Sequence, residues 1–175
     1  MDKKTAFFAK ADKLKPFYDG VYKIILFVCK LLLLGDVFIT SMSVLGRYVS
    51  FVPDPSWSEE IVLTLMAYMA VLSAALAIRK GAHIRMTAFD KFFSKKVLKV
   101  SDLLGDTLVC AFGVVMLFVG ISYANAIGAK GVYVSLPSLS KFWMYFPVPL
   151  AGLAMVIFEM EAMYKHIKAL VLKEV

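Results

Sequence analysis

The sequence has little of what catalytic and cofactor-binding sites are made from. Its 175 residues include two histidines and two cysteines. His83 and His166 both lie outside the apolar blocks, which argues against a four-helix haem subunit, because such a subunit needs histidines within its helices. Cys29 and Cys110 lie inside apolar blocks, so a disulfide is not expected. Neither a glycine-rich phosphate loop nor a Cys/His zinc spacing is present. We therefore expect no enzyme activity and no cofactor.

Charged residues are also scarce. They make up 19% of the chain, hydrophobic residues make up 61%, and the mean hydropathy is +0.77. A soluble domain is nearer half apolar and a quarter charged. The apolar residues fall into four blocks, each near the roughly 20 residues that a membrane-spanning helix needs. We predict an all-α integral membrane protein, a single membrane domain over 1–175, with spans at about 21–48, 58–78, 103–127 and 142–162.

The basic residues are distributed unevenly around these blocks. They gather in the N-terminal segment, in the connection over 79–102 and in the C-terminal tail, and the other two connections hold only Arg47, Lys130 and Lys141 near their edges. The positive-inside rule then places the N-terminus, the 79–102 loop and the C-terminus in the cytoplasm. The net charge of +7 has the same origin, and it indicates contact with anionic lipid headgroups rather than with nucleic acid.

The basic N-terminal segment followed by an apolar run also fits a cleaved signal peptide at first sight. The run is longer than the roughly 7–15 residues of a signal core, and Lys30 and Asp36 interrupt it. We expect the first helix to be retained. The first twenty residues mix lysines with Phe7, Phe8 and Phe17, which fits either a short interfacial segment or a frayed basic tail.

One acid lies near the middle of the first span. Asp36, Thr40, Ser43 and Arg47 have the i, i+4, i+7, i+11 spacing of one helical face. A carboxylate that faces lipid costs at least ~2.5–3.5 kcal/mol, so this face should contact protein. Two interpretations of Asp36 remain open: a proton or ion site, or a buried structural carboxylate paired with a lysine or a hydroxyl.

Small residues recur at helical spacing in the second and third blocks. In the second they are Ala67, Ala70, Ala74, Ala77 and Gly81, and in the third Gly113, Gly120 and Ala124 share a face with two acids. Small faces let membrane helices approach closely, so we predict helix packing along both.

Acids and bases also gather near the cytoplasmic ends of the predicted spans. Asp102 and Asp106 accompany Arg79, Lys80 and Arg85, and Glu159 and Glu161 accompany Lys165. Since each group lies at one depth, we predict structural ion pairs within it. His83, in the same connection, is expected to be a hydrogen-bonded loop residue.

The short connection between the first two blocks carries two adjacent acids. Trp57 suits a membrane interface, and Glu59 and Glu60 follow it. Both acids lie at the same membrane level as Arg47. We predict an Arg47–Glu59 or an Arg47–Glu60 pair, with contact to another subunit as the alternative.

The order and spacing of these motifs match a known family. The runs are Gly46-Arg47-Tyr48, Trp57-Ser58-Glu59-Glu60 and Arg79-Lys80-Gly81-Ala82-His83-Ile84-Arg85, with Leu136-Pro137, Trp143 and Pro147 in the last quarter. Together they resemble the small membrane subunit of tripartite ATP-independent periplasmic (TRAP) transporters, the DctQ family. One departure is that the family often has an acid just after the His-Ile-basic run, where this chain has Met86-Thr87.

The resemblance implies a bacterial inner-membrane transporter of three parts. A periplasmic substrate-binding protein captures an organic anion, and a large membrane transport subunit carries it inward, driven by sodium ions that bind in that large subunit. The small subunit broadens the static scaffold against which the transport domain moves like an elevator. The chain is most similar to sialic-acid systems, with C4-dicarboxylates remaining open.

Two other functions are compatible with the residues. One is a self-contained four-helix proton-coupled exporter with Asp36 as the coupling acid. Such exporters are shorter, whereas this chain has about 20 residues in the basic 79–102 loop and further residues in its tails. The other is an assembly or sensor protein with no transport role, which predicts normal uptake after deletion.

Overall fold

The computed structural model describes residues 14–49, 51, 55–81 and 95–171. In that part of the chain the elements are helical: α2 (Lys15–Tyr48), α3 (Ser58–Arg79), α4 (Lys95–Tyr123), the π-helix η3 (Ala124–Gly128), α5 (Phe142–Tyr145) and α6 (Pro147–Val171). Four segments are long and apolar enough to cross a bilayer, namely Lys15–Tyr48, Ser58–Arg79, Val100–Gly128 and Phe142–Lys168. The prediction of an all-α protein with four membrane-spanning helices is therefore confirmed.

The helix ends differ in places from those expected. The first helix begins at Lys15 rather than near residue 21, and Pro16 occupies its first turn, where the missing N–H leaves no hydrogen bond unmade. The fourth span is interrupted, because α5 ends at Tyr145 and α6 begins at Pro147. Pro147 lies at this interruption and lacks the N–H that would continue the helix from α5. Gly81, which follows the C-terminal cap Lys80 of α3, has a φ of 62°, the left-handed conformation that commonly ends a helix.

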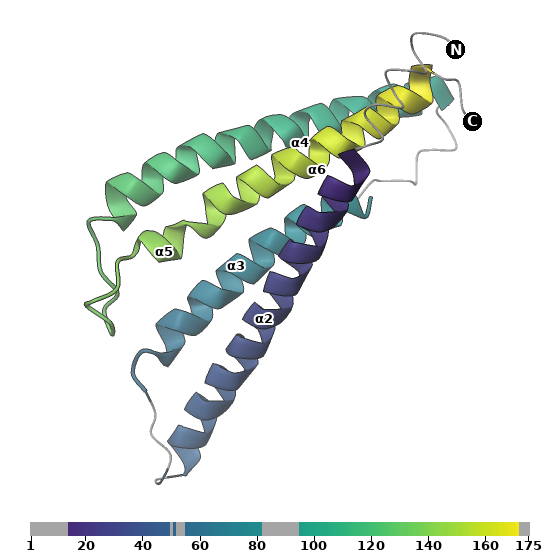
Figure 1. The fold of residues 1–175 in the computed structure, drawn as a ribbon. Coiled ribbons are helices and arrows are strands. Elements are labelled where there is room, and N and C mark those ends of the chain that lie inside the picture. Colours follow the sequence, from purple (N-terminus) through teal and green to yellow (C-terminus); the bar gives the residue numbers. More distant parts are fainter. Residues whose placement is uncertain (1–13, 50, 52–54, 82–94, 172–175) are drawn as a thin grey trace.

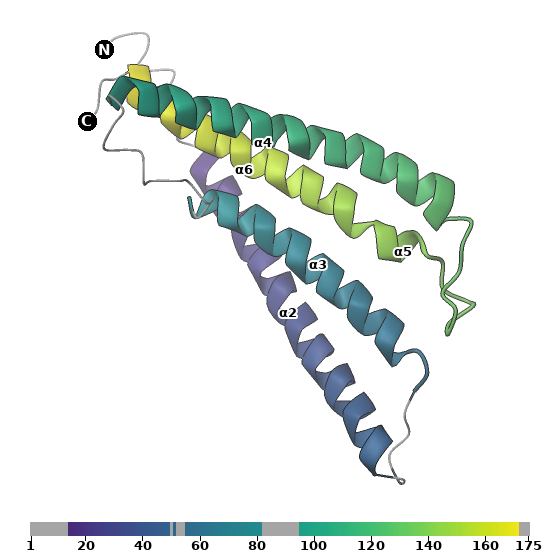
Figure 2. The same cartoon turned by 180° about the vertical axis from the view of Figure 1, so that it is seen from behind.

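The long helices lie in a row rather than in a closed bundle. Their order is α2, α3, α6, α4, and the two opposite views agree on it (Figures 1 and 2). They converge where α2 begins and α3 and α6 end, which we call the basic end, and spread toward the aromatic end, where Trp57 and Trp143 lie. The two inner helices, α3 and α6, have a neighbouring helix on both sides. The most apolar stretch of the segment Phe142–Lys168 is 44% buried, whereas that of the outer helix Lys15–Tyr48 is only 6% buried, so most of α2 faces outward.

The core lies between α3 and α6 and is completed by α2. It includes Leu72 and Ala75 of α3, Phe158 of α6 and Cys29 of α2. On α3 the contact with its neighbours is made chiefly by larger side chains, whereas Ala70, Ala74 and, just beyond the helix, Gly81 are exposed. The prediction that the small residues of the second block form a packing face is therefore wrong for those three positions within this chain.

The small face of the third block does pack as predicted. Gly113 and Gly120 of α4 are buried against α6. The approach is so close that a Cβ atom on Gly152 of α6 would lie 2.7 Å from both the carbonyl oxygen of Gly113 and the amide nitrogen of Leu117. Only glycine fits there, because backbone atoms and not flexible side chains occupy the space.

Candidate functional site

Arg79, the last residue of α3, organises the basic end. Its Nε donates to Glu161 Oε2 of α6 at 2.7 Å, and its Nη2 donates to Glu161 Oε1 at 3.4 Å and to Asp19 Oδ1 of α2. The Arg79 side chain is 13% exposed and that of Glu161 is 5% exposed. A nearly buried guanidinium thus joins three helices through two carboxylates, which is the kind of pairing that a buried charge requires.

The surroundings of Arg79 complete this cluster. The guanidinium carbon lies 5.1 Å from the ring centroid of Tyr22 and 6.0 Å from that of Phe158, within the range of cation–π attraction. Lys165 Nζ lies 2.8 Å from Glu161 Oε1, one turn further along α6. The pairing of Glu161 with Lys165 was predicted, and the two partners of Arg79 were not. The sequence did not predict Asp19 as a partner of Arg79, because Asp19 lies among the first twenty residues, which fit a basic tail or an interfacial segment.

Asp106 has a different partner from the one predicted. Its Oδ2 lies 2.5 Å from His166 Nδ1, so the contact joins α4 to α6. Arg79 binds Glu161 and Asp19 instead, and the predicted cluster of Asp102 and Asp106 with Arg79 is wrong for that arginine. The physical reason is the order of the helices, because α6 lies between α3 and α4.

The corner between α2 and α3 at the aromatic end contains a predicted pair. Arg47 Nη2 donates to Glu59 Oε1, and Ser43, one turn before Arg47 on α2, accepts a hydrogen bond from the hydroxyl of Ser58 at 3.2 Å. Both serines are buried. Of the two pairs that the sequence allowed for Arg47, the structure therefore contains the one with Glu59.

Glu60 binds a different part of the chain. Its carboxylate accepts hydrogen bonds from the amide of Val134 at 3.1 Å, from the amide of Ser135 at 2.8 Å and from the Ser135 hydroxyl. One turn along α3, Thr64 Oγ1 lies 2.9 Å from the hydroxyl of Tyr133, a residue that is 1% exposed. Together these contacts hold the segment 129–141 against the start of α3. Sequence reasoning missed this role, because nothing local links residue 60 to a loop more than 70 residues later.

The residues of the predicted Asp36 face separate in the structure. Ser43 faces α3, whereas Thr40 is exposed. Asp36 is half-buried, and its Oδ1 is buried without a hydrogen-bond partner among the described residues. The predicted pairing of Asp36 with a lysine or hydroxyl is thus not seen for this oxygen within the described chain. In the same residues no group of three or more His, Cys, Asp or Glu side chains is placed to hold a metal ion.

The remaining predicted residues are Trp57, Asp102, His83 and Arg85. Trp57 is half-buried and directly precedes α3, and Asp102 is half-buried on α4 one turn before Asp106. His83 and Arg85 lie outside the described residues.

Comparison with known proteins identifies a matching family and a similar protein. The family model of tripartite ATP-independent periplasmic transporters, DctQ component, matches residues 36–169. The sialic acid TRAP transporter small permease protein SiaQ of Vibrio cholerae is 30% identical over 121 residues, which cover 67% of this chain and 67% of that protein. The family match contains the Arg47–Glu59 pair, the Glu60 contacts and all of the basic-end cluster except its α2 residues.

Proposed function

Since the chain belongs to the DctQ family of TRAP transporters and is a small permease subunit of that type, we propose that it is the scaffold subunit of a transporter that imports an organic anion. Family membership and the four apolar helices also make it a multi-pass protein of the bacterial inner membrane. The proposed substrate class is sialic acid, which the name of the Vibrio cholerae relative suggests, with C4-dicarboxylates as the alternative.

The observation that carries this proposal is the open row of four helices. At each end of the row, polar groups of this chain bind one another. At the basic end Arg79 binds Glu161 and Asp106 binds His166, and at the aromatic end Glu60 binds the segment 129–141. Between the two ends the helices present long apolar faces, and among the described residues α2 and α4 each have a helix neighbour on one side only. Such a slab suits a static support that widens a larger membrane subunit.

In the proposed complex the large membrane transport subunit binds the slab, holds the sodium sites and moves its transport domain like an elevator. Positive residues gather at the basic end, so we place that end in the cytoplasm and the aromatic end in the periplasm. The Arg47–Glu59 corner and the segment 129–141 would then lie where a periplasmic substrate-binding protein could dock.

Uptake measurements test the proposal. Proteoliposomes would contain the large subunit with or without this chain, and labelled sialic acid and its binding protein would be added outside under a sodium gradient. We expect uptake only when both membrane subunits are present, and a tag on this chain should co-purify the large subunit. Full uptake by the large subunit alone would refute the scaffold role.

Proteoliposomes that contain this chain alone test the self-contained exporter. Family membership favours the transporter subunit, so the purified chain alone should transport no substrate when a proton gradient is imposed across the membrane. Proton-coupled transport by the chain alone, abolished by Asp36→Asn but retained by the control Thr40→Val on the exposed part of the same face, would establish the exporter instead.

A further inference from the structure

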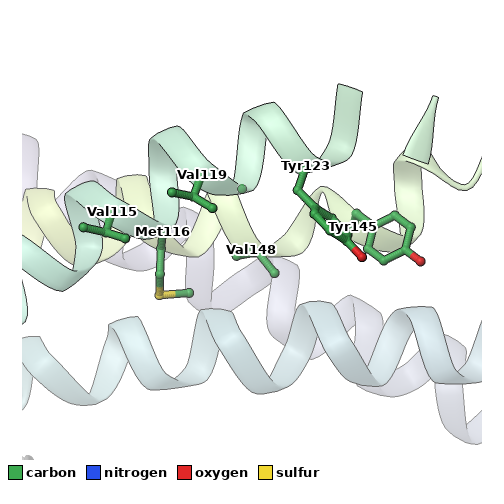
Figure 3. Close-up of a pocket in the computed structure, with 7 residues that line it drawn as sticks. Val115, Met116, Val119, Tyr123, Tyr145 and Val148 are labelled. Carbon is green, nitrogen blue, oxygen red and sulfur yellow. The ribbon is translucent and has the colours of Figure 1, made fainter. Parts of the chain in front are cut away.

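An apolar groove runs along the half of α4 that leads to the aromatic end. It has a volume of about 290 Å³, and its lining is Val115, Met116, Val119, Gly120 and Tyr123 of α4, Tyr145 of α5 and Val148 of α6. Figure 3 shows Val115 at one end of this group and the two tyrosines together at the other. Val115 and Val119 are 55% and 61% exposed, so the groove opens on the surface of the helix row and not on its core.

The length of the groove and its position along the span correspond to one leaflet of a bilayer. Val115 lies at the middle of the candidate span Val100–Gly128, and Tyr123 lies near its end. At 1.5 Å per residue the distance between these two positions along α4 is ~12 Å. Half of a hydrocarbon core ~30 Å thick is ~15 Å. A partner helix that crosses the bilayer would require a groove along the whole span, whereas an acyl chain requires only this half.

The ends of the groove differ in chemistry as a lipid site requires. Its lining exposes no polar surface. The rings of Tyr123 and Tyr145 meet edge to face, with centroids 5.1 Å apart, at the aromatic end. Tyrosine suits the boundary between hydrocarbon and headgroups, because its ring is apolar and its hydroxyl can bind polar groups. Lys130, which is exposed, follows η3 at the same end and adds a positive charge that complements a phosphate.

We propose that this groove binds one acyl chain of a phospholipid from the leaflet at the aromatic end. The chain lies along α4 beside Val119 and Val148, and its headgroup lies near the two tyrosines and Lys130. The lipid fills the hollow at the level where the fourth span is interrupted between α5 and α6.

A pair of matched tryptophan variants tests the site. Val119→Trp places a large ring in the groove, whereas Val114→Trp places it at an exposed valine on the same helix outside the lining. The purified, delipidated chain would be titrated with 1-palmitoyl-2-oleoyl-phosphatidylglycerol, and native mass spectrometry would count the bound lipids. We expect the first lipid to bind at least tenfold more weakly to Val119→Trp and unchanged to Val114→Trp. Equal affinity of both variants and the unaltered chain would overturn the proposal.

A second measurement uses the unaltered chain and so does not depend on how the variants fold. Membranes that contain the whole transporter would be loaded with phosphatidylglycerol carrying a diazirine in mid-chain, illuminated, and analysed by peptide mass spectrometry. We expect adducts on Met116, Val119 or Tyr123 that an excess of unlabelled lipid prevents. Adducts spread evenly along α4, or release of the large subunit by Val119→Trp with an unchanged lipid count, would show that the groove is not a lipid site.

Discussion

The close approach of α4 and α6 at Gly152 makes a quantitative prediction. In Gly152→Ala the new Cβ would lie 2.7 Å from two backbone atoms of α4, and ordinary contact begins at about 3.4 Å. The helices must therefore separate by about 0.7 Å at this point. A gap of ~0.5–1 Å forfeits a quarter to a half of each van der Waals contact along the seam. Overpacking of this kind typically costs about 1–3 kcal/mol, so we expect Gly152→Ala to destabilise the chain by that amount.

The matched control is Gly105→Ala on α4. A Cβ at Gly105 meets nothing within 4 Å, so this variant adds only the helix-propensity gain of up to about 1 kcal/mol. Thermal unfolding in detergent can be followed with a fluorogenic thiol reagent after the half-buried Cys110 is replaced by serine, because Cys29 is buried in the core and reacts when the helices separate. For a chain of this size 1 kcal/mol corresponds to roughly 2–4 °C. If the two variants melt at the same temperature, the close approach of α4 and α6 is refuted.

Two further predictions concern the polar contacts. Arg79→Ala should cost roughly 3–5 kcal/mol, because it leaves a buried carboxylate of α6 without its main partner, whereas the exposed neighbour Lys80→Ala should change little in the same thermal assay. Equal melting of these two would contradict the role of Arg79. Glu60→Ala should make the amides of residues 132–136 exchange roughly tenfold faster in hydrogen-exchange mass spectrometry, and Glu59→Ala should not. Unchanged exchange in both would show that the segment is held by other contacts.

Polar contacts were predictable from the sequence when they were local. Arg47 and Glu59 flank one short connection between antiparallel helices, so both had to lie at the same level. Lys165 lies one turn after Glu161 on one helix. In each case the covalent chain itself keeps the two groups within reach.

Contacts between distant segments were not predictable in this way. Asp106 and Arg79 share a depth, yet Asp106 binds His166, because α6 and not α3 is the neighbour of α4. The contacts of Glu60 with Val134 and Ser135 also depend on how the segment 129–141, between η3 and α5, lies against the start of α3.

The sequence by itself determined that four helices cross a membrane. An apolar run of about 20 residues has one stable form in a bilayer, since every backbone group must be hydrogen-bonded within it. The tertiary structure alone decided that these helices form an open row in the order α2, α3, α6, α4. In lipid no hydrophobic force selects which apolar faces meet, so the choice depends on close fits such as Gly113 on Gly152 and on pairings such as Arg79 with Glu161.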